Sequence, residues 1–206
     1  MSLNPTDLRQ TLLRLRAQQD PADCRRGALL MRGRLFTWLN SYKKQWSHPD
    51  RPIHIAAFWA LAQEPDLQPL LQQWADDKQL RLSLPCIVAE NAPLVFKPWQ
   101  PTTPMKSALF GVQEPDTLEI APHPDIILVP TLGFSRQGDR LGYGKGYYDR
   151  TLAQLQAQSH PFISIGIAWA VGDLSSYSYH PQAHDVPLDA VLTDKGWAVP
   201  APTFTG

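Results

Sequence analysis

Residues 125–152 read DIILVPTLGFSRQGDRLGYGKGYYDRTL. The opening apolar run is typical of a short buried strand, residues 131–145 form a loop, and a helix pattern runs from Gly146 to about Gln158. A further strand pattern covers Pro161–Trp169, and a last one covers Asp189–Thr193. Strand, helix and strand in succession imply right-handed crossovers and a mainly parallel sheet covered on both faces. We therefore expect an α/β fold whose ligand binds beyond the carboxyl ends of the strands.

The first half of the chain shows the same alternation of helix and strand patterns. The expected elements are an N-terminal helical segment over about residues 6–40, divided at Asp20-Pro21, then a strand over Ile53–Ala60, a helix from Leu67 to about Lys78 and a strand over Leu80–Val88. Residues 91–124 are rich in proline and are expected to form a long irregular excursion, apart from the short apolar run Pro93–Lys97. We predict a single domain over residues 1–206, with a Rossmann-like three-layer architecture and helices on both faces of the sheet.

Composition limits the partners of this chain. The 206 residues carry a formal net charge of zero, so no global field draws the molecule toward nucleic acid or a membrane surface. Residues 1–40 hold seven arginines and no lysine, and this segment can bind an anion locally.

Cys24 and Cys86 fall in an expected helix and an expected strand, which favours reduced thiols. Without a signal-peptide pattern or an apolar run near the length of a membrane span, a cytoplasmic protein is expected.

The loop RLGYGKGYYDR, residues 140–150, has the chemistry of a phosphate cradle. Glycines at every second position leave the backbone amides bare and permit positive φ, so several N–H groups can converge on one anion. The helix that follows adds its positive end, and Lys145 adds a mobile charge. Asp149 can hold a magnesium ion against the phosphate oxygens. A tight structural turn is the alternative, because the loop matches neither the Walker A pattern nor the dinucleotide fingerprint.

The longer string LVPTLGFSRQGDRLGYGKGYYDRTL resembles the signature region of the 5-formyltetrahydrofolate cyclo-ligases, also called 5,10-methenyltetrahydrofolate synthetases. Three further segments resemble this family in the same order: FWALAQEPD (Phe58–Asp66), FGVQEP (Phe110–Pro115) and HDVPLDAVLT (His184–Thr193). The motifs together extend over about residues 8–195, so the resemblance covers nearly the whole chain. It implies an enzyme that uses ATP and Mg²⁺ to convert 5-formyltetrahydrofolate to 5,10-methenyltetrahydrofolate, with release of ADP and phosphate.

The resemblance also implies roles for individual residues. ATP would be bound by Arg9, Arg140, Leu141, Gly142, Tyr143, Gly144, Lys145, Gly146, Tyr147 and Tyr148. The reduced folate, with or without a polyglutamate tail, would be bound by Trp59, Glu64, Tyr143, Gly144, Lys145, Gly146 and Tyr147. Lys145 and Tyr147 would be catalytic, and Asp149 and Asp189 would hold magnesium. The family usually has a basic residue four positions before the arginine that Arg9 matches, but this chain has Pro5 there. Two alternatives follow: the phosphate site is less cationic, or Arg14 or another arginine substitutes.

Several of these residues have ordinary structural alternatives. Glu64 precedes Pro65 and can be a solvated carboxylate at a helix start, Trp59 can be part of the core, and Asp189 can simply begin a strand.

Two other functions of the protein also stay open. A sugar-phosphate isomerase-like enzyme on a similar α/β scaffold would use the glycine loop without Glu64 or a nucleotide. A non-catalytic nucleotide-binding or RNA-binding protein would use the N-terminal arginines, although the neutral charge and the lack of an RNA-binding aromatic signature argue against it.

Overall fold

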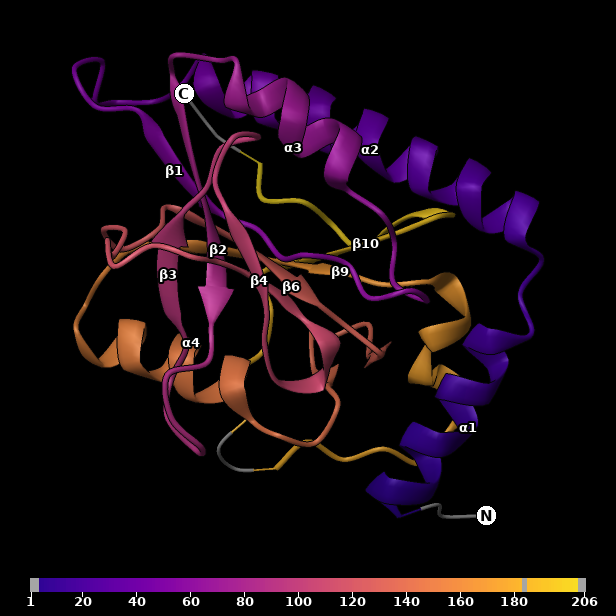
Figure 1. The fold of residues 1–206 in the computed structure, drawn as a ribbon. Coiled ribbons are helices and arrows are strands. Elements are labelled where there is room, and N and C mark those ends of the chain that lie inside the picture. Colours follow the sequence, from indigo (N-terminus) through magenta and orange to yellow (C-terminus); the bar gives the residue numbers. More distant parts are fainter. Residues whose placement is uncertain (1–3, 183–184, 204–206) are drawn as a thin grey trace.

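The computed structural model describes residues 4–182 and 185–203, with only the backbone of Phe110, and its centre is a seven-stranded sheet (Figure 1). In spatial order the strands are β3 (Val95–Pro98), β2 (Leu80–Cys86), β1 (Ile53–Ala56), β6 (Ile126–Pro130), β9 (Ile163–Ile167), β10 (Ala190–Thr193) and β11 (Gly196–Val199). The five central strands are parallel, and β3 and β11 pair antiparallel at the two edges. The expectation of a mainly parallel sheet in an α/β fold is confirmed.

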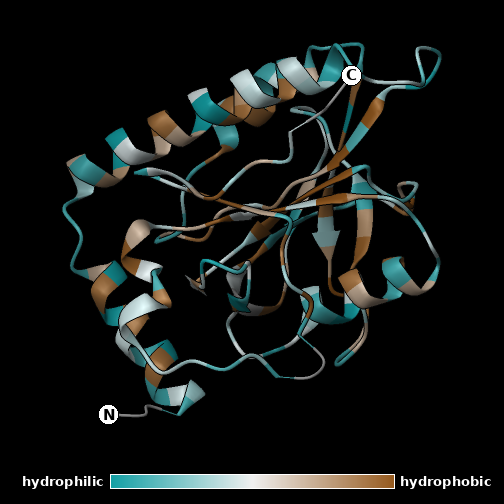
Figure 2. Ribbon diagram, turned by 180° about the vertical axis from the view of Figure 1, so that it is seen from behind, coloured by the Kyte–Doolittle hydropathy of each residue, from teal (hydrophilic) through white to brown (hydrophobic). Residues whose placement is uncertain are grey.

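Helices cover both faces of this sheet (Figures 1 and 2). The helices α2 (Pro21–Lys43) and α3 (Gln68–Ala75) lie on one face, and α4 (Tyr147–Ala157) lies on the other. Successive side chains of a strand point to opposite faces, so Leu128 of β6 joins the core under α2 while its neighbour Val129 joins the core over α4. Among the described residues, no helix combines the length and the apolar character that a membrane span requires.

The first helix, α1 (Pro5–Ala17), packs beside a small hairpin instead of covering the sheet. Its N-terminus is capped by Asn4, whose side-chain oxygen accepts hydrogen bonds from two backbone N–H groups of the first turn. Leu8 and Leu12 are buried in a cluster with two leucines of this hairpin region, which is formed by β7 (Gly133–Phe134) and β8 (Arg140–Leu141). Leu132 directly precedes β7, and Leu141 belongs to β8. This packing brings α1 next to the glycine-rich loop that follows β8.

The segments expected to be irregular contain short regular elements. Residues 91–124 include β3 and, beyond it, β4 (Met105–Ser107), the 3-10 helix η1 (Leu109–Gly111) and β5 (Gln113–Pro115). The loop 131–145 includes β7 and β8, and two further 3-10 helices, η2 (Ala170–Gly172) and η3 (Leu174–Ser176), follow β9. Strands of two to four residues are too short for their alternation to be detected. β1 also ends at Ala56, although the apolar run continues to Ala60, because the chain leaves the sheet while Phe58 stays buried.

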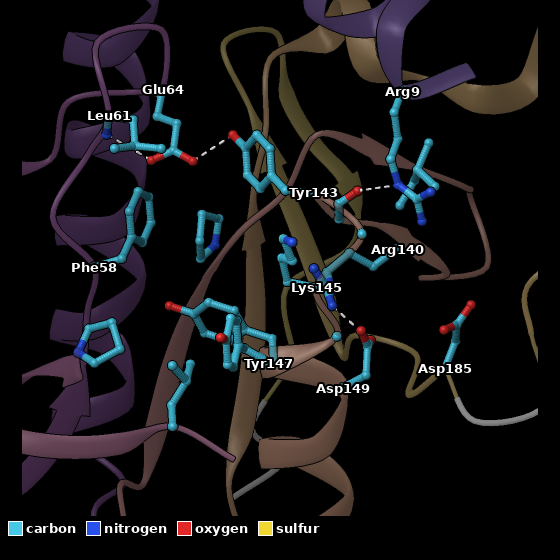
Figure 3. Close-up of a pocket in the computed structure, with 18 of the residues that line it drawn as sticks. Arg9, Phe58, Leu61, Glu64, Arg140, Tyr143, Lys145, Tyr147, Asp149 and Asp185 are labelled. Atoms are coloured by element: carbon cyan, nitrogen blue, oxygen red, sulfur yellow. Dashed lines mark hydrogen bonds and ion pairs between the residues drawn. The ribbon is translucent and has the colours of Figure 1, made fainter. Parts of the chain in front are cut away.

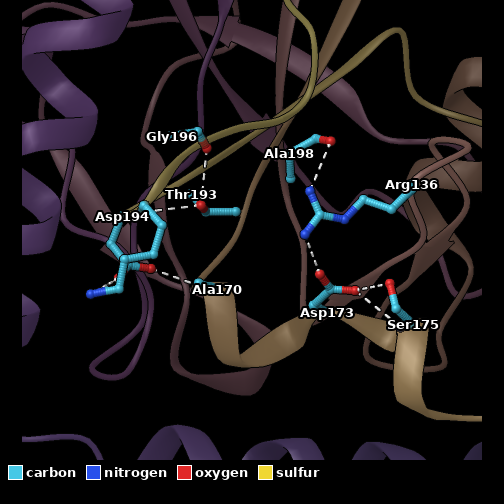
Figure 4. Close-up of polar contacts among 9 residues, drawn as sticks. Arg136, Ala170, Asp173, Ser175, Thr193, Asp194, Gly196 and Ala198 are labelled. Atoms are coloured by element: carbon cyan, nitrogen blue, oxygen red, sulfur yellow. Dashed lines mark hydrogen bonds and ion pairs between the residues drawn. The ribbon is translucent and has the colours of Figure 1, made fainter.

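The C-terminal edge of the sheet is held by polar contacts (Figure 4). The Thr193 hydroxyl donates to the Gly196 carbonyl at 2.9 Å, which closes the turn between β10 and β11. The backbone N–H of Ala170 donates to the Asp194 carboxylate at 2.8 Å, which ties this turn to η2. The strand β11 was not among the expected elements, and it completes the sheet as an antiparallel edge.

Both cysteines are free thiols, as expected from the sequence. Cys86 is buried on β2, and burial raises the pKa of its thiol to about 12. The thiol is therefore neutral and packs as a small apolar group.

Candidate active site

A pocket of about 580 Å³ opens where β1, β2 and β6 end (Figure 3). Its lining includes Arg9, Trp59, Glu64, residues 140–148 and Asp149. These are all the residues predicted to bind ATP or the folate, together with one of the two predicted magnesium ligands. We call the part around Glu64 the Glu64 end, and the part formed by Arg9, Arg140, the glycine loop (residues 142–146) and Asp149 the glycine-loop end.

The glycine loop connects β8 to α4. Gly144 and Gly146 have φ values of 87° and 65°, a region where a residue with a Cβ atom is strained. Gly146 is the N-cap residue of α4 and has no side chain that could cap the first amides, so this helix N-terminus opens at the pocket. Arg9 of α1 donates from Nε to the Gly142 carbonyl at 2.9 Å and thereby ties α1 to the loop.

Arg140 and Asp149 form an ion pair at the glycine-loop end (Figure 3). The guanidinium donates to the Asp149 carboxylate at 2.7 Å, and the two side chains are only 5% and 14% exposed. The Nε atom of Arg140 and the hydroxyl of Tyr148 are buried and have no hydrogen-bond partner among the described residues. Burial also raises the pKa of Tyr148, so its hydroxyl keeps its proton. Arg140 and Tyr148 both line the pocket, so two unpaired buried donors belong to residues of its wall.

The Glu64 end is built from a chain of hydrogen bonds. The Tyr143 hydroxyl donates to one oxygen of Glu64 at 2.6 Å, and the backbone N–H of Leu61 donates to the other at 2.9 Å. Glu64 is only 9% exposed and lies before α3, which begins at Gln68, so it is not a solvated carboxylate at a helix start. Burial, together with the charge of Glu64, raises the pKa of Tyr143 and keeps its hydroxyl protonated. The carboxylate is thereby held in a fixed orientation at the pocket wall.

Aromatic and aliphatic side chains form an apolar wall next to Glu64. Phe58 and Trp59 follow β1, and Ile87 follows β2. The ring of Trp59 also lies against Trp99 of the core, with centroids 6.2 Å apart in an edge-on arrangement. Trp59 therefore belongs both to the core and to the pocket wall, and the wall suits a flat heteroaromatic ligand.

Comparison with known proteins identifies the family of this chain. Residues 4–194 match the model of the 5-formyltetrahydrofolate cyclo-ligase family. The chain belongs to this family. A 5-formyltetrahydrofolate cyclo-ligase of Haemophilus influenzae is 33% identical over 68% of this chain and 74% of its own length, and one of Escherichia coli is 30% identical over 72% and 74%. The NMR structure of the 5,10-methenyltetrahydrofolate synthetase of Aquifex aeolicus is 25% identical, covers 99% of this chain and 97% of its own, and superposes with a TM-score of 0.75.

Membership in the cyclo-ligase family makes this protein an enzyme of the ligase class. It favours the first of the three functions that the sequence left open over the sugar-phosphate isomerase and the RNA-binding protein. The structure and the family agree on the overall fold, because the superposition covers nearly the whole chain.

Two residues that the sequence analysis named as candidates for the site do not line the pocket. Asp189 precedes β10, at the opposite end of the strand from the pocket, and its carboxylate accepts hydrogen bonds from the backbone N–H and the hydroxyl of Ser164, both at 2.7 Å. Asp189 therefore lies apart from Asp149, and its contacts fit the alternative interpretation that it is a residue at the start of a strand. Arg14, the candidate substitute for the basic residue absent at Pro5, is exposed and does not line the pocket. His184 lies outside the described residues.

Two further buried charged residues, one next to the pocket and one in its wall, were not predicted from the sequence. Arg16 is only 4% exposed and continues the buried stripe of Leu8 and Leu12 at a spacing of four, a position where a charged residue signals a specific partner. Glu114, inside the quoted FGVQEP segment, lines the pocket and accepts a hydrogen bond from the backbone N–H of Ile87 at 2.8 Å. The sequence does not show that Glu114 is buried at the pocket, because the segment around it has no periodic pattern of apolar residues.

Proposed function

We propose that this protein catalyses the cyclisation of 5-formyltetrahydrofolate to 5,10-methenyltetrahydrofolate, with ATP and Mg²⁺, and releases ADP and phosphate. The observation that carries the proposal is that one pocket joins a glycine loop suited to a polyphosphate with a buried carboxylate suited to a pterin. Tyr143 links the two, because it belongs to the loop and hydrogen-bonds Glu64. The names of the relatives support the same reaction.

The Glu64 end is assigned to the pterin. A carboxylate offers about four lone-pair positions, and the hydrogen bonds from Tyr143 and Leu61 use one on each oxygen. The remaining positions can accept two adjacent N–H donors from the amino edge of a pterin, as charge-assisted hydrogen bonds. Phe58 and Trp59 would then pack against the apolar surface of the folate.

The reaction requires activation of the formyl group, because its oxygen is a poor leaving group. The formyl oxygen attacks the γ-phosphorus of ATP, the bond to the bridging oxygen breaks, and ADP leaves. The neighbouring folate amine then attacks the formyl carbon, and phosphate departs with the former formyl oxygen while the amine loses its proton. The protein contributes mainly by positioning the two substrates and by stabilising developing charge.

Lys145 and Tyr147 are assigned to the reacting oxygen. Both line the pocket and are drawn between Glu64 and Asp149 in Figure 3. An ammonium group at this point stabilises negative charge as it moves onto the transferred phosphoryl group, and a phenol can donate to the same oxygen. Arg140, which is paired with Asp149, would add a cation on the buried side of the site.

Asp149 is assigned to magnesium. The described residues contain no group of three or more His, Cys, Asp or Glu side chains that could hold a metal. A single carboxylate beside a phosphate site still fits Mg²⁺, which commonly takes one or two carboxylates and completes its coordination with substrate phosphates and water. The bound ion would neutralise charge on the phosphates. Asp149 also holds Arg140 in place, so it orders two cationic groups at the same edge of the pocket.

The near-ultraviolet absorbance of the methenyl product tests this function. Purified protein with 5-formyltetrahydrofolate and Mg²⁺ should form the product only when ATP is added, and one ADP should appear for each product molecule. Matched reactions without Mg²⁺ or without the folate are the controls. Absence of product, or product formed without ATP, would overturn the proposal. Thermal stabilisation by sugar phosphates alone would instead favour the isomerase-like enzyme.

A further inference from the structure

Arg16 lies behind the pocket and does not line it. Its guanidinium is buried, and its two terminal nitrogens donate to different acceptors. One donates to the Tyr143 hydroxyl at 2.7 Å, and the other donates to the carbonyl of Thr131, directly after β6, at 2.9 Å. The side chain thus joins α1, the end of β6 and the glycine loop.

The direction of the hydrogen bonds in this chain follows from the chemistry of its members. Arginine has only donors, so the Tyr143 oxygen must accept from Arg16. Tyrosine has a single O–H proton, and this proton must then point to Glu64, whose oxygen lies 2.6 Å away. The guanidinium offers no acceptor, so it excludes its own side of the oxygen as a direction for the O–H bond. Arg16 therefore determines which way the hydroxyl points.

Packing alone does not explain an arginine at this position. Leu8 and Leu12 precede it on the same buried stripe of α1, so an apolar side chain would continue the pattern without the desolvation of a charge. The cost of burying the guanidinium is offset only where both of its acceptors are correctly placed. The two observed acceptors are a backbone carbonyl and the hydroxyl that contacts Glu64.

We propose that Arg16 is a positioning residue for the Glu64 end, acting through Tyr143 to fix the orientation of the carboxylate that binds the pterin. The inference rests on the proposed function, because it assumes that the folate binds at Glu64. It assigns a role to α1 at both ends of the pocket. Arg9 fixes the backbone of the loop at Gly142, and Arg16 fixes the side chain of the next residue, Tyr143.

The experiment is a double-mutant cycle on folate binding. The dissociation constant of 5-formyltetrahydrofolate is measured without ATP, so that no turnover occurs, for the wild type, Arg16→Gln, Tyr143→Phe and the double variant. Arg16→Gln should weaken binding about tenfold in the wild-type background, the loss typical of a hydrogen bond to a charged group. In the Tyr143→Phe background the same change should alter binding less than about twofold, because its effect passes through the hydroxyl. Arg14→Gln is the matched control, since Arg14 is exposed on the same helix.

The outcomes separate the positioning role from general stability and from the proposed function. Additive effects in the cycle would overturn the role of Arg16, and so would unchanged binding in Arg16→Gln. If Arg16→Gln does not fold, Arg16→Lys replaces it in the cycle, because an ammonium keeps the charge but not the planar fork that serves two acceptors. If Arg16→Lys does not fold either, Arg16 serves overall stability and the inference fails. Wild-type protein that binds no reduced folate would overturn the proposed function itself, whatever the variants do.

Discussion

The two ends of the pocket differ in how their polar groups are satisfied. At the Glu64 end, Arg16, Tyr143 and Glu64 form a continuous chain in which each hydroxyl or carboxylate oxygen has a donor or an acceptor in place. At the glycine-loop end, Arg140 keeps a buried Nε without a partner among the described residues, and the N-cap residue of α4, Gly146, has no side chain to cap the helix. One end is therefore assembled by the protein alone, while the other presents donors to a ligand.

The difference has a consequence for the two substrates. A site with a fixed hydrogen-bond pattern selects its ligand by shape and by donor position, which suits a pterin. A site with bare amides and cations selects by negative charge, which suits a polyphosphate. Substitutions at the glycine-loop end should therefore change the binding of ATP, and substitutions at the Glu64 end should change the binding of the folate. Single substitutions at each end test that separation.

The largest effect is expected for Arg140→Gln. The change removes a buried cation from the glycine-loop end and leaves the Asp149 carboxylate without its partner. We expect kcat/KM for ATP to fall by about 100-fold or more. We also expect the free energy of unfolding to fall by about 3–5 kcal/mol, as measured by urea denaturation, because a buried charge loses its partner.

A second substitution separates these two consequences. Adding Asp149→Asn to Arg140→Gln removes the unpaired charge, so stability should recover while turnover does not. If Arg140→Gln retains normal ATP kinetics, the ion pair serves only to hold the fold, and the glycine-loop end is not the nucleotide site.

Glu64→Gln should have the next largest effect, and only on the folate. Replacing the carboxylate by an amide removes charge-assisted acceptors and puts an N–H₂ group opposite a donor, either Tyr143 or Leu61. Affinity for 5-formyltetrahydrofolate should fall by about 1.5–3 kcal/mol, or about 10- to 150-fold in Kd, by calorimetric titration. ATP affinity should stay within a factor of about two. Equal losses for both substrates would contradict the separation of the two ends.

The sequence predicted the parts of this comparison that depend on local patterns. The strand of residues 126–130, the glycine loop and α4 could be recognised because apolar runs and alternate glycines follow local rules, and α1 and α2 because their periodicity is strong. The burial of Glu64 and its hydrogen bond to Tyr143 join residues 79 positions apart, and no local pattern encodes such a contact. The position of Asp189, which was predicted to hold magnesium, could not be foreseen for the same reason, because only the sheet topology shows that this residue lies at the other end of its strand.

Asp149→Asn is expected to have a smaller effect, which depends on what Asp149 holds. If the carboxylate binds Mg²⁺, turnover falls by about tenfold, or about 1.4 kcal/mol in transition-state stabilisation, and the Mg²⁺ concentration for half-maximal rate rises. If it only positions Arg140, turnover falls equally at every Mg²⁺ concentration. Rates measured across a magnesium titration distinguish the two roles. A folded variant with unchanged turnover and an unchanged titration would exclude both.

The smallest effect is expected for Arg9→Ala. Arg9 lines the pocket, but its side chain donates a hydrogen bond to the Gly142 carbonyl, so its contribution to the nucleotide is partly indirect, through the shape of the glycine loop. Losing one hydrogen bond of this kind is worth about 0.5–1.5 kcal/mol, so the KM for ATP should rise about two- to tenfold while the KM for the folate stays unchanged. Steady-state kinetics with each substrate varied in turn measures both values, and Arg14→Ala on the exposed side of the same helix is the control.

A rise in the folate KM of equal size would show that the loop transmits the change to Tyr143, and the two ends of the pocket would then have to be treated as one coupled site. Normal kinetics for both substrates would leave Arg9 with a packing role and remove α1 from the glycine-loop end.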